Sequence, residues 1–221
     1  MLVMNREELY KIAEDAVCEE ELTTKDIPCI DLYVDQILNL VSDKNAQGSE
    51  RYRDKQLTKT MINNYSKDGL ITPIKGKKYS REQIVQILTV YTLKNTLSIG
   101  EIKRLLDGEY AVEGYSPDHL LDSYDRYIDI KRDNRDFSQE ILGELLDKYE
   151  LDITDEKDFM LIVGSLLSLS GSLRSIAQAL IDEKYPIPDE AEEKQRAKEA
   201  KKEKSKEKGE SKEKKKKKED E

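Results

Sequence analysis

Hydrophobic positions along this chain recur mostly at intervals of three and four residues, and runs of strictly alternating polar and apolar residues are nearly absent. Such spacing places apolar side chains on one face of a helix, so the pattern predicts a mainly α-helical protein. Capping residues divide the pattern into separate elements. The expected helices cover about residues 5–20, 31–42, 59–68, 81–95 and 99–108, with further helices starting at 117 and 138 and the longest one running from 154 or 155 to about 183.

The segment between the predicted helices 59–68 and 81–95 has a different character. Gly69 stands where a left-handed residue would end the first helix, and Leu70 follows as the apolar contact expected after such an ending. Residues 70–74 and 75–79, with Gly76 at the tip, are typical of a short two-stranded hairpin. Ser80 and, further on, Ser98 each open a helix with a capping box.

The last predicted helix carries an apolar stripe with heptad spacing, which is typical of helices that pair along a seam. Two interpretations remain open, a stripe that packs on its own chain and a homodimer interface through residues 159–180, and both can hold in part. No membrane contact is expected, because the longest apolar stretch, residues 159–173, is shorter than a membrane span. The stripe consists of Phe159, Ile162, Leu166, Leu169, Leu173, Ile176 and Leu180.

Charge is distributed very unevenly along the chain. The whole chain carries a net charge of −9, yet residues 51–81 hold nine basic and two acidic side chains, a local charge of +7. The residues of 1–188 that lie outside this basic region together carry a net charge of −18. A localised positive field of this size attracts a polyanion, most commonly nucleic acid. The acidic remainder disfavours non-specific wrapping, so nucleic acid should meet this one region.

The C-terminal residues 189–221 consist almost entirely of Lys, Glu, Ala, Ser and Asp, and they predict a disordered, solubilising tail. Cys18 and Cys29 are isolated and the chain has one histidine, so neither a metal site nor a cofactor is expected. Two isolated cysteines fit a reducing compartment. The N-terminus lacks the basic start and apolar run of a secretory signal. The sequence therefore predicts a soluble cytoplasmic protein.

The order helix, glycine stop, small basic hairpin, helix, capping box and helix is the organisation of a winged helix-turn-helix. Three pieces carry the likeness: Tyr65-Ser66-Lys67-Asp68-Gly69-Leu70, Lys75-Gly76-Lys77-Lys78-Tyr79 and Leu97-Ser98-Ile99-Gly100-Glu101-Ile102. Through them, residues 57–106 resemble the DNA-binding domain of the MerR family. Together with Asp31-Leu32-Tyr33-Val34-Asp35-Gln36 and Thr58-Lys59-Thr60-Met61-Ile62-Asn63-Asn64-Tyr65, this block also looks like a bacterial family of unknown function that bears this MerR-like domain. The resemblance covers about residues 25–130. The resemblance implies a winged helix-turn-helix that binds duplex DNA.

A helix of about nine residues can lie in the major groove, with side chains toward base edges and its flanks on phosphates. The expected groove residues are Lys59, Thr60, Asn63, Asn64 and Lys67, while Met61, Ile62 and Tyr65 would mostly face inward. The expected contacts to the DNA backbone are Arg51, Arg53, Tyr65, Lys75, Lys77, Lys78 and Arg81. For Tyr65 and Tyr79 the alternative is ring packing of the wing against the helix.

Two features depart from the family. The family usually carries an arginine at the position of Asn63. A helix-turn-helix also joins its two helices by a turn of a few residues, whereas some fifteen residues separate the predicted helix 31–42 from Thr58. Either a short polar helix at 49–56 or the helix 31–42 would supply the first helix of the motif.

Taken together, the sequence predicts four parts: an N-terminal helix (1–24), a MerR-like winged helix-turn-helix domain (25–110), a helical module for dimerisation or effector binding (111–188) and the tail (189–221). The expected function is a dimeric, sequence-specific transcriptional regulator whose small-molecule effector is unidentified. The alternative is a protein-interaction adaptor that keeps the winged-helix fold without binding DNA. An enzyme is not expected, because no phosphate-binding or nucleophile motif occurs and the single histidine, His119, lies beside Asp118 near a helix start.

Overall fold

A computed structural model describes residues 4–49, 56–74 and 76–187. Three of the predicted DNA contacts, Arg51, Arg53 and Lys75, lie outside the described residues, and so does the predicted tail 189–221. Among the described residues, those up to Ile181 form one compact unit, and residues 182–187 fall outside it.

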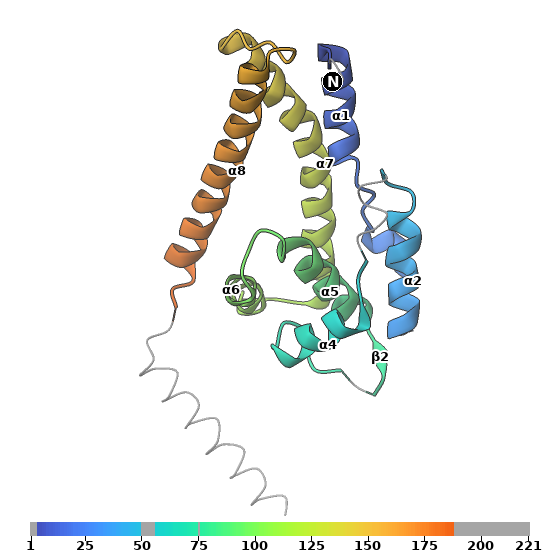
Figure 1. Cartoon of the computed structure of the whole chain (residues 1–221). Helices are drawn as coiled ribbons and strands as arrows, with labels where there is room; N and C mark the ends of the chain where they lie inside the picture. The colour runs from blue at the N-terminus through green and yellow to red at the C-terminus, as the bar shows by residue number, and fades with distance from the viewer. Residues whose placement is uncertain (1–3, 50–55, 75, 188–221) are drawn as a thin grey trace, which may run out of the picture. The chain divides into compact units, whose positions relative to one another are not determined.

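The described chain is mainly helical with one small antiparallel sheet, as the hydrophobic pattern predicts at this coarse level. Figure 1 shows the order of the elements along the chain. They are α1 (Arg6–Val17), the 3₁₀ helix η1 (Thr24–Asp26), β1 (Leu32–Tyr33), α2 (Val34–Asn45), α4 (Lys59–Lys67), β2 (Lys78–Tyr79), α5 (Arg81–Leu93), α6 (Ile99–Tyr110), α7 (Pro117–Lys148) and α8 (Glu156–Lys184).

Four of the predicted helix starts are confirmed by their capping hydrogen bonds. The side chains of Thr58, Ser80, Ser98 and Ser116 each accept from the backbone N–H three residues further on. These bonds satisfy donors that a helix leaves without a partner in its first turn. Ser80 and Ser98 also form the predicted capping boxes with the residues three positions later.

The predicted hairpin within residues 70–79 is wrong. Strand β2 pairs instead with β1, antiparallel, with Leu32 opposite Tyr79 and Tyr33 opposite Lys78. The helix that was expected to follow Asp31 therefore begins only at Val34, after β1.

Side chains of α5 explain why residues 70–74 form no strand with β2. The amide of Gln83 donates to the carbonyls of Thr72 and Pro73, both at 3.1 Å. The side-chain oxygen of Gln86, which is fully buried, accepts from the Thr72 N–H at 2.9 Å. Pro73 has no N–H to offer a strand. The backbone of this segment is thus satisfied by α5 rather than by a sheet partner.

The two helices predicted to start at 117 and 138 are one continuous helix. Helix α7 has 32 residues and exceeds the 29 residues of α8, which was expected to be the longest. Ser138 lies inside α7, where its hydroxyl donates to the carbonyl of Arg135 at 2.6 Å. A serine can bond the preceding turn in this way without interrupting a helix, which is why its capping tendency misled the prediction.

Buried apolar side chains form two clusters, and α7 contributes to both. The first cluster extends from Leu22 to Ile128 and includes Leu120 and Tyr124 of α7, so this core continues beyond residue 110. The second consists of Leu142, Leu146 and Ile162, covered by apolar residues of α1. Figure 1 shows α7 passing beside α5 and beside α1, the two helices it contacts most.

Ion pairs occupy the stretch of α7 between the two clusters. Lys131 pairs with Glu19 and lies 3.2 Å from Glu21, and Arg135 also pairs with Glu21. Glu21 is only 7% exposed. A buried carboxylate needs cationic partners of this kind to remain charged. The N-terminal segment that follows α1, residues 18–26, is therefore held against the middle of α7 by ion pairs rather than by apolar contact.

Helix α8 divides its apolar stripe between its own chain and the surface. Ile162 and Ile181 are buried, and Gln178 donates to Glu101 of α6 at 2.7 Å. Leu166, Leu173, Ile176 and Leu180 are exposed, as are most other apolar side chains of this helix, namely Phe159, Met160, Leu161, Val163 and Leu167. Part of the stripe thus packs on its own chain, and most of it does not.

By length and composition, α8 is apolar enough to cross a membrane, with a mean hydropathy of 1.5 over its most apolar 18 residues, of which 6% are buried. The argument that the apolar stretch is too short therefore does not hold for the whole helix. One such helix is weak evidence of a membrane segment, because helices of soluble proteins meet the same criteria.

Candidate nucleic-acid interface

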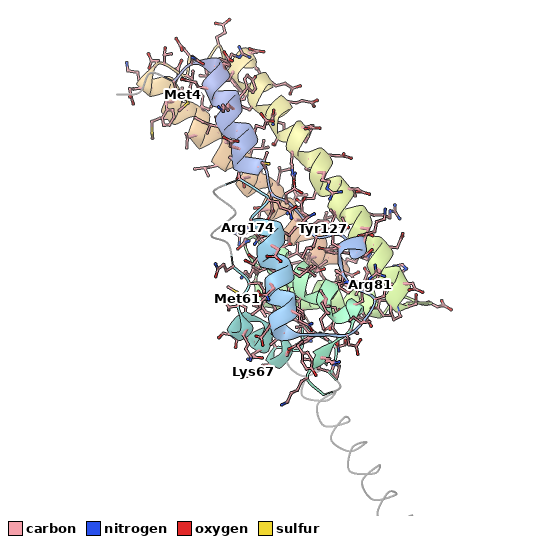
Figure 2. The ribbon with its side chains drawn as sticks, turned by 90° about the vertical axis from the view of Figure 1, so that its right-hand side faces the viewer. Met4, Met61, Lys67, Arg81, Tyr127 and Arg174 are labelled. Carbon is pink, nitrogen blue, oxygen red and sulfur yellow. The ribbon has the colours of Figure 1, made fainter. Side chains whose placement is uncertain are left out.

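Helix α4 separates its residues into a buried side and an exposed side. Ile62 is fully buried and Tyr65 is 4% exposed, so both belong to the core of the first cluster. Met61 is half-buried, and Met61 and Lys67 are labelled in Figure 2. The five residues predicted to face DNA all lie exposed on this helix: Lys59, Thr60, Asn63, Asn64 and Lys67. The inward orientation predicted for Met61 and Ile62 is also confirmed.

The end of α4 is held by the backbone conformation of Gly69 and by two hydrogen bonds. Gly69 has a φ of 70°, the left-handed conformation that glycine adopts without steric cost. The N–H of Leu70, which is 1% exposed, donates to the Tyr65 carbonyl at 2.9 Å. From α6, the ammonium of Lys103 donates to the Gly69 carbonyl at 3.3 Å. The position of α4 is thus set from both its own sequence and α6.

Residues 76–79 bring further cations beside α4. Lys77 and Lys78 are exposed, and the Lys78 ammonium lies 5.0 Å from the ring centroid of Tyr33 in β1. A groove of about 330 Å³ is lined by Lys59 and Asn63 of α4 together with Gly76 and Lys77. It also contains Asp35 of α2, whose carboxylate weakens the positive potential there.

Two of the predicted backbone contacts do not face this surface. Tyr65 is buried and burial raises the pKa of its hydroxyl to about 12, so the prediction of a phosphate contact is wrong and the alternative of ring packing holds. Arg81 directs its guanidinium to the carbonyl of Thr24 in the N-terminal segment. That contact uses the charge of Arg81 to hold the fold rather than to face α4. Tyr79, at 7% exposed, also packs in the core.

Helix α2 packs against α4, which favours α2 as the first helix of the motif. The competing expectation, a short helix at 49–56, falls almost wholly on residues outside the described range. Lys103 is a cation that sequence reasoning missed, because it lies on α6, beyond the basic region 51–81. Its spacing from Gly69 along the chain gives no signal of the contact.

No metal centre accompanies this surface in the described part of the chain, where no group of three or more His, Cys, Asp or Glu side chains is placed to hold an ion. Cys18 and Cys29 are free thiols. Nε2 of His119 lies 3.3 Å from a carboxylate oxygen of Glu109, on the helix preceding α7. His119 is exposed and Glu109 is half-buried, so this is a single contact at the surface rather than a cluster of reactive groups.

Residues 22–127 match the family described as a domain of unknown function, DUF1836. The matched range nearly coincides with the first hydrophobic cluster, which runs from Leu22 to Ile128. The candidate interface therefore lies inside the part of the chain that this family covers, while α8 lies outside it. No curated protein and no solved structure gives a significant match.

Proposed function

We propose that this protein is a dimeric, sequence-specific DNA-binding transcriptional regulator built on a MerR-like winged helix-turn-helix. In this proposal α4 enters the major groove and residues 76–79 act as the wing. The observation that carries it is the exposed polar face of α4, with Lys59 and Lys67 at its ends and Lys77 and Lys78 beside it.

The chemistry of this face suits duplex DNA. An asparagine amide can donate to and accept from adenine in the major groove, which is worth roughly 1–3 kcal/mol of discrimination. Asn63 and Asn64 lie between the two terminal lysines of α4 and are both exposed. Lysines at the ends of a recognition helix and on a wing hold phosphates and fix the register of the helix.

The exposed stripe of α8 supports a dimer. Leu166, Leu173, Ile176 and Leu180 continue the heptad spacing and remain uncovered by the rest of the described chain. Heptad spacing is needed for helix pairing and is not needed for insertion into a membrane, so a second copy fits this stripe better than lipid does. A dimer would place two copies of α4 on the two half-sites of an operator. A regulator of this kind would act in the cytoplasm.

An adaptor that uses the same fold without DNA is the second candidate, and the apolar surface of α8 favours it. DNA binding at several salt concentrations separates the two. Each phosphate neutralised contributes about 0.9 to the slope of log affinity against log salt. Removal of Lys77 and Lys78 from both copies of a dimer should therefore lower the slope by up to about 4.

The test compares the wild type with K77A/K78A and with K11A/K157A, on random duplex DNA and on DNA selected from a library. Lys11 and Lys157 are exposed on α1 and α8, so the control removes the same charge elsewhere. Salt-sensitive binding that K77A/K78A weakens and K11A/K157A retains supports the proposal. Absence of wild-type binding at low salt refutes it and leaves the adaptor.

A further inference from the structure

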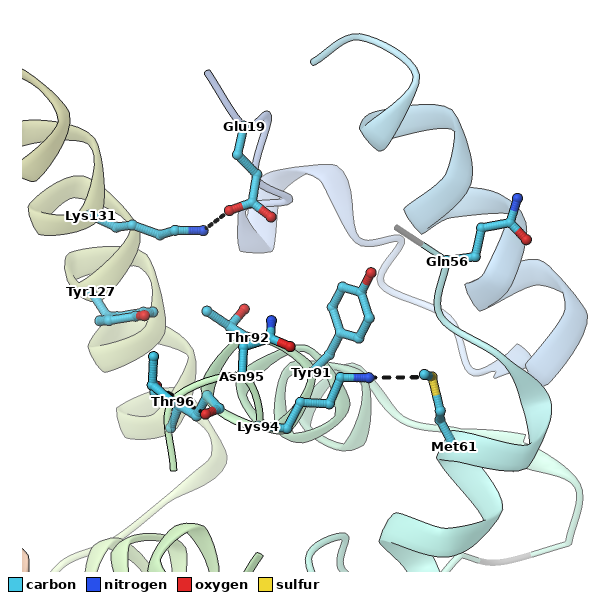
Figure 3. A pocket seen from close by; sticks show the side chains of 11 residues that line it. Glu19, Gln56, Met61, Tyr91, Thr92, Lys94, Asn95, Thr96, Tyr127 and Lys131 are labelled. Carbon is cyan, nitrogen blue, oxygen red and sulfur yellow. Dashed lines mark hydrogen bonds and ion pairs between the residues drawn. The ribbon is translucent and has the colours of Figure 1, made fainter. Parts of the chain in front are cut away.

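A cavity of about 450 Å³ lies beside the half-buried edge of α4 and has the size of a small-molecule site. Figure 3 shows its walls, which come from α4, α5, α7 and the segment after α1. The lining is mixed, with apolar and aromatic side chains and a few polar groups. The residues that matter here are Met61, Tyr91, Lys94, Tyr127, Lys131 and Glu19.

Lys94 is the unusual group in this cavity. Its ammonium lies 3.4 Å from the sulfur of Met61 and 4.8 Å from the ring centroid of Tyr91. Both partners are weak acceptors. Burial lowers the pKa of Lys94, and no carboxylate in the described part of the chain lies within ion-pair distance of it. A partly desolvated cation without a counter-charge attracts an anion.

The opposite wall is already neutralised. Lys131 pairs with Glu19, as Figure 3 shows, and this pair leaves no net charge there. Burial raises the pKa of the hydroxyls of Tyr91 and Tyr127, so both rings present neutral groups at physiological pH. Among the described residues, the cavity thus has one unmatched positive charge, on Lys94, among aromatic and thioether surfaces.

We propose that this cavity binds a small carboxylic acid with an aromatic or apolar body, the carboxylate on Lys94 and the body against Tyr91, Tyr127 and Met61. The ligand would replace the sulfur of Met61 as the partner of Lys94. Because Met61 belongs to α4, occupancy would alter the packing of that helix and hence DNA binding. This regulatory consequence rests on the proposed function, whereas the binding site itself does not.

The chain's four methionines make the site directly observable, since Met61 lines this cavity and Met160 lines a separate apolar groove between α7 and α8. The full chain, labelled with ¹³C at the methionine methyl groups, is titrated with 2-naphthoate, benzoate and the neutral 2-naphthamide. The variants are K94Q and the control K148Q. Lys148 also lies over a neighbouring ring, 5.2 Å from the centroid of Tyr149, but it is exposed.

We expect 2-naphthoate to shift the Met61 signal in the wild type and in K148Q. It should bind the wild type about tenfold more tightly than it binds K94Q, and about tenfold more tightly than 2-naphthamide binds the wild type. The proposal is overturned if 2-naphthoate binds K94Q as tightly as the wild type, or if 2-naphthamide binds the wild type as tightly as 2-naphthoate does. It is also overturned if only the Met160 signal shifts, or if neither carboxylate shifts the Met61 signal at millimolar concentration. DNA binding is then measured with and without 2-naphthoate. If 2-naphthoate shifts the Met61 signal but the protein binds no DNA, the ligand site stands and only the proposed function is refuted.

Discussion

The exposed stripe of α8 gives a quantitative prediction for the substitution Ile176→Ala. Ile176 is 58% exposed, so burying it fully in a dimer would remove that share of its surface from water. Full burial of an isoleucine side chain is worth about 1.5–3 kcal/mol, which puts the exposed share at roughly 1 kcal/mol or slightly more. Each dimer contains two copies, so the loss is about 2 kcal/mol, or roughly a 30-fold rise in the dimer Kd.

Ile130 provides a matched control, because it is the same residue type, also lies on a long helix, and is 57% exposed on α7. Sedimentation velocity over a range of concentrations would give the Kd of the wild type, I176A and I130A. We expect I130A to match the wild type. An equal rise in both variants, or no rise in I176A, would refute the assignment of the stripe as the dimer seam.

A wild type that stays monomeric at every concentration would also refute the dimer. Flotation with phosphatidylcholine vesicles would then test the remaining occupant of α8. Association with neutral lipid that I176A weakens would identify the helix as a membrane contact, in line with its length and composition.

Three further predictions concern α4 and its supports. Gly69→Ala should destabilise the fold by about 1–2 kcal/mol, because a φ of 70° is unfavourable for alanine. The control Gly100→Ala, which has open space around its Cβ, should instead stabilise the fold by up to about 1 kcal/mol. Urea unfolding of both variants would measure these changes. Tyr65→Phe should be neutral or stabilising, since the buried hydroxyl has no hydrogen-bond partner among the described residues. Burial raises the pKa of Tyr65 from 10 to about 12. The stability that the neutral hydroxyl contributes to the wild type is therefore fully present below pH 10 and is lost as the pH rises to 12. Tyr65→Phe has no hydroxyl to ionise, so in a series of thermal melts at increasing pH this variant should lose less stability than the wild type over that window. Asn63→Ala should change which operator sequence is preferred, and an equal loss of affinity on every sequence in a selection experiment would contradict its role as a base reader.

Local signals explain what could be predicted from the sequence. Thr58, Ser80 and Ser98 mark helix starts because each cap depends on residues within three positions. Gly69 marks the end of α4 for the same reason. The exposed and buried sides of α4 follow from the helical period alone, which is why five of the predicted DNA-facing residues lie exposed together.

Contacts between distant residues explain what the sequence did not show. The partner of β2 is β1, more than forty residues earlier, and two-residue strands carry too little pattern to reveal the pairing. The buried amides Gln83 and Gln86, which replace a sheet partner for Thr72, look like surface residues in a helical pattern. The cavity at Lys94 likewise gathers residues from four separate segments, and none of them has a local signature.

Lys131 joins the proposed ligand cavity to the ionic contact between the two hydrophobic clusters. It lines the cavity, and it also pairs with Glu19 and Glu21, which hold the N-terminal segment against the middle of α7. Burial alone would lower the pKa of Lys131, but the hydrogen bond and charge of Glu19, with Glu21, raise it, so Lys131 stays charged at neutral pH. On its far side α7 continues to Leu142 and Leu146, which pack against Ile162 of α8.

Lys94, which contacts Met61 of α4, lines the same cavity as Lys131 of α7, and α7 continues to the helix proposed for dimerisation. A ligand in the cavity would therefore complete a contiguous set of contacts between α4 and α7. Contiguity becomes coupling only if the ligand binds two states of the protein with different affinity. The structure indicates where such a difference would arise, because a carboxylate on Lys94 displaces Met61 while leaving the Lys131–Glu19 pair in place. The ligand should thus act first on α4, and change DNA affinity more strongly than it changes the dimer Kd.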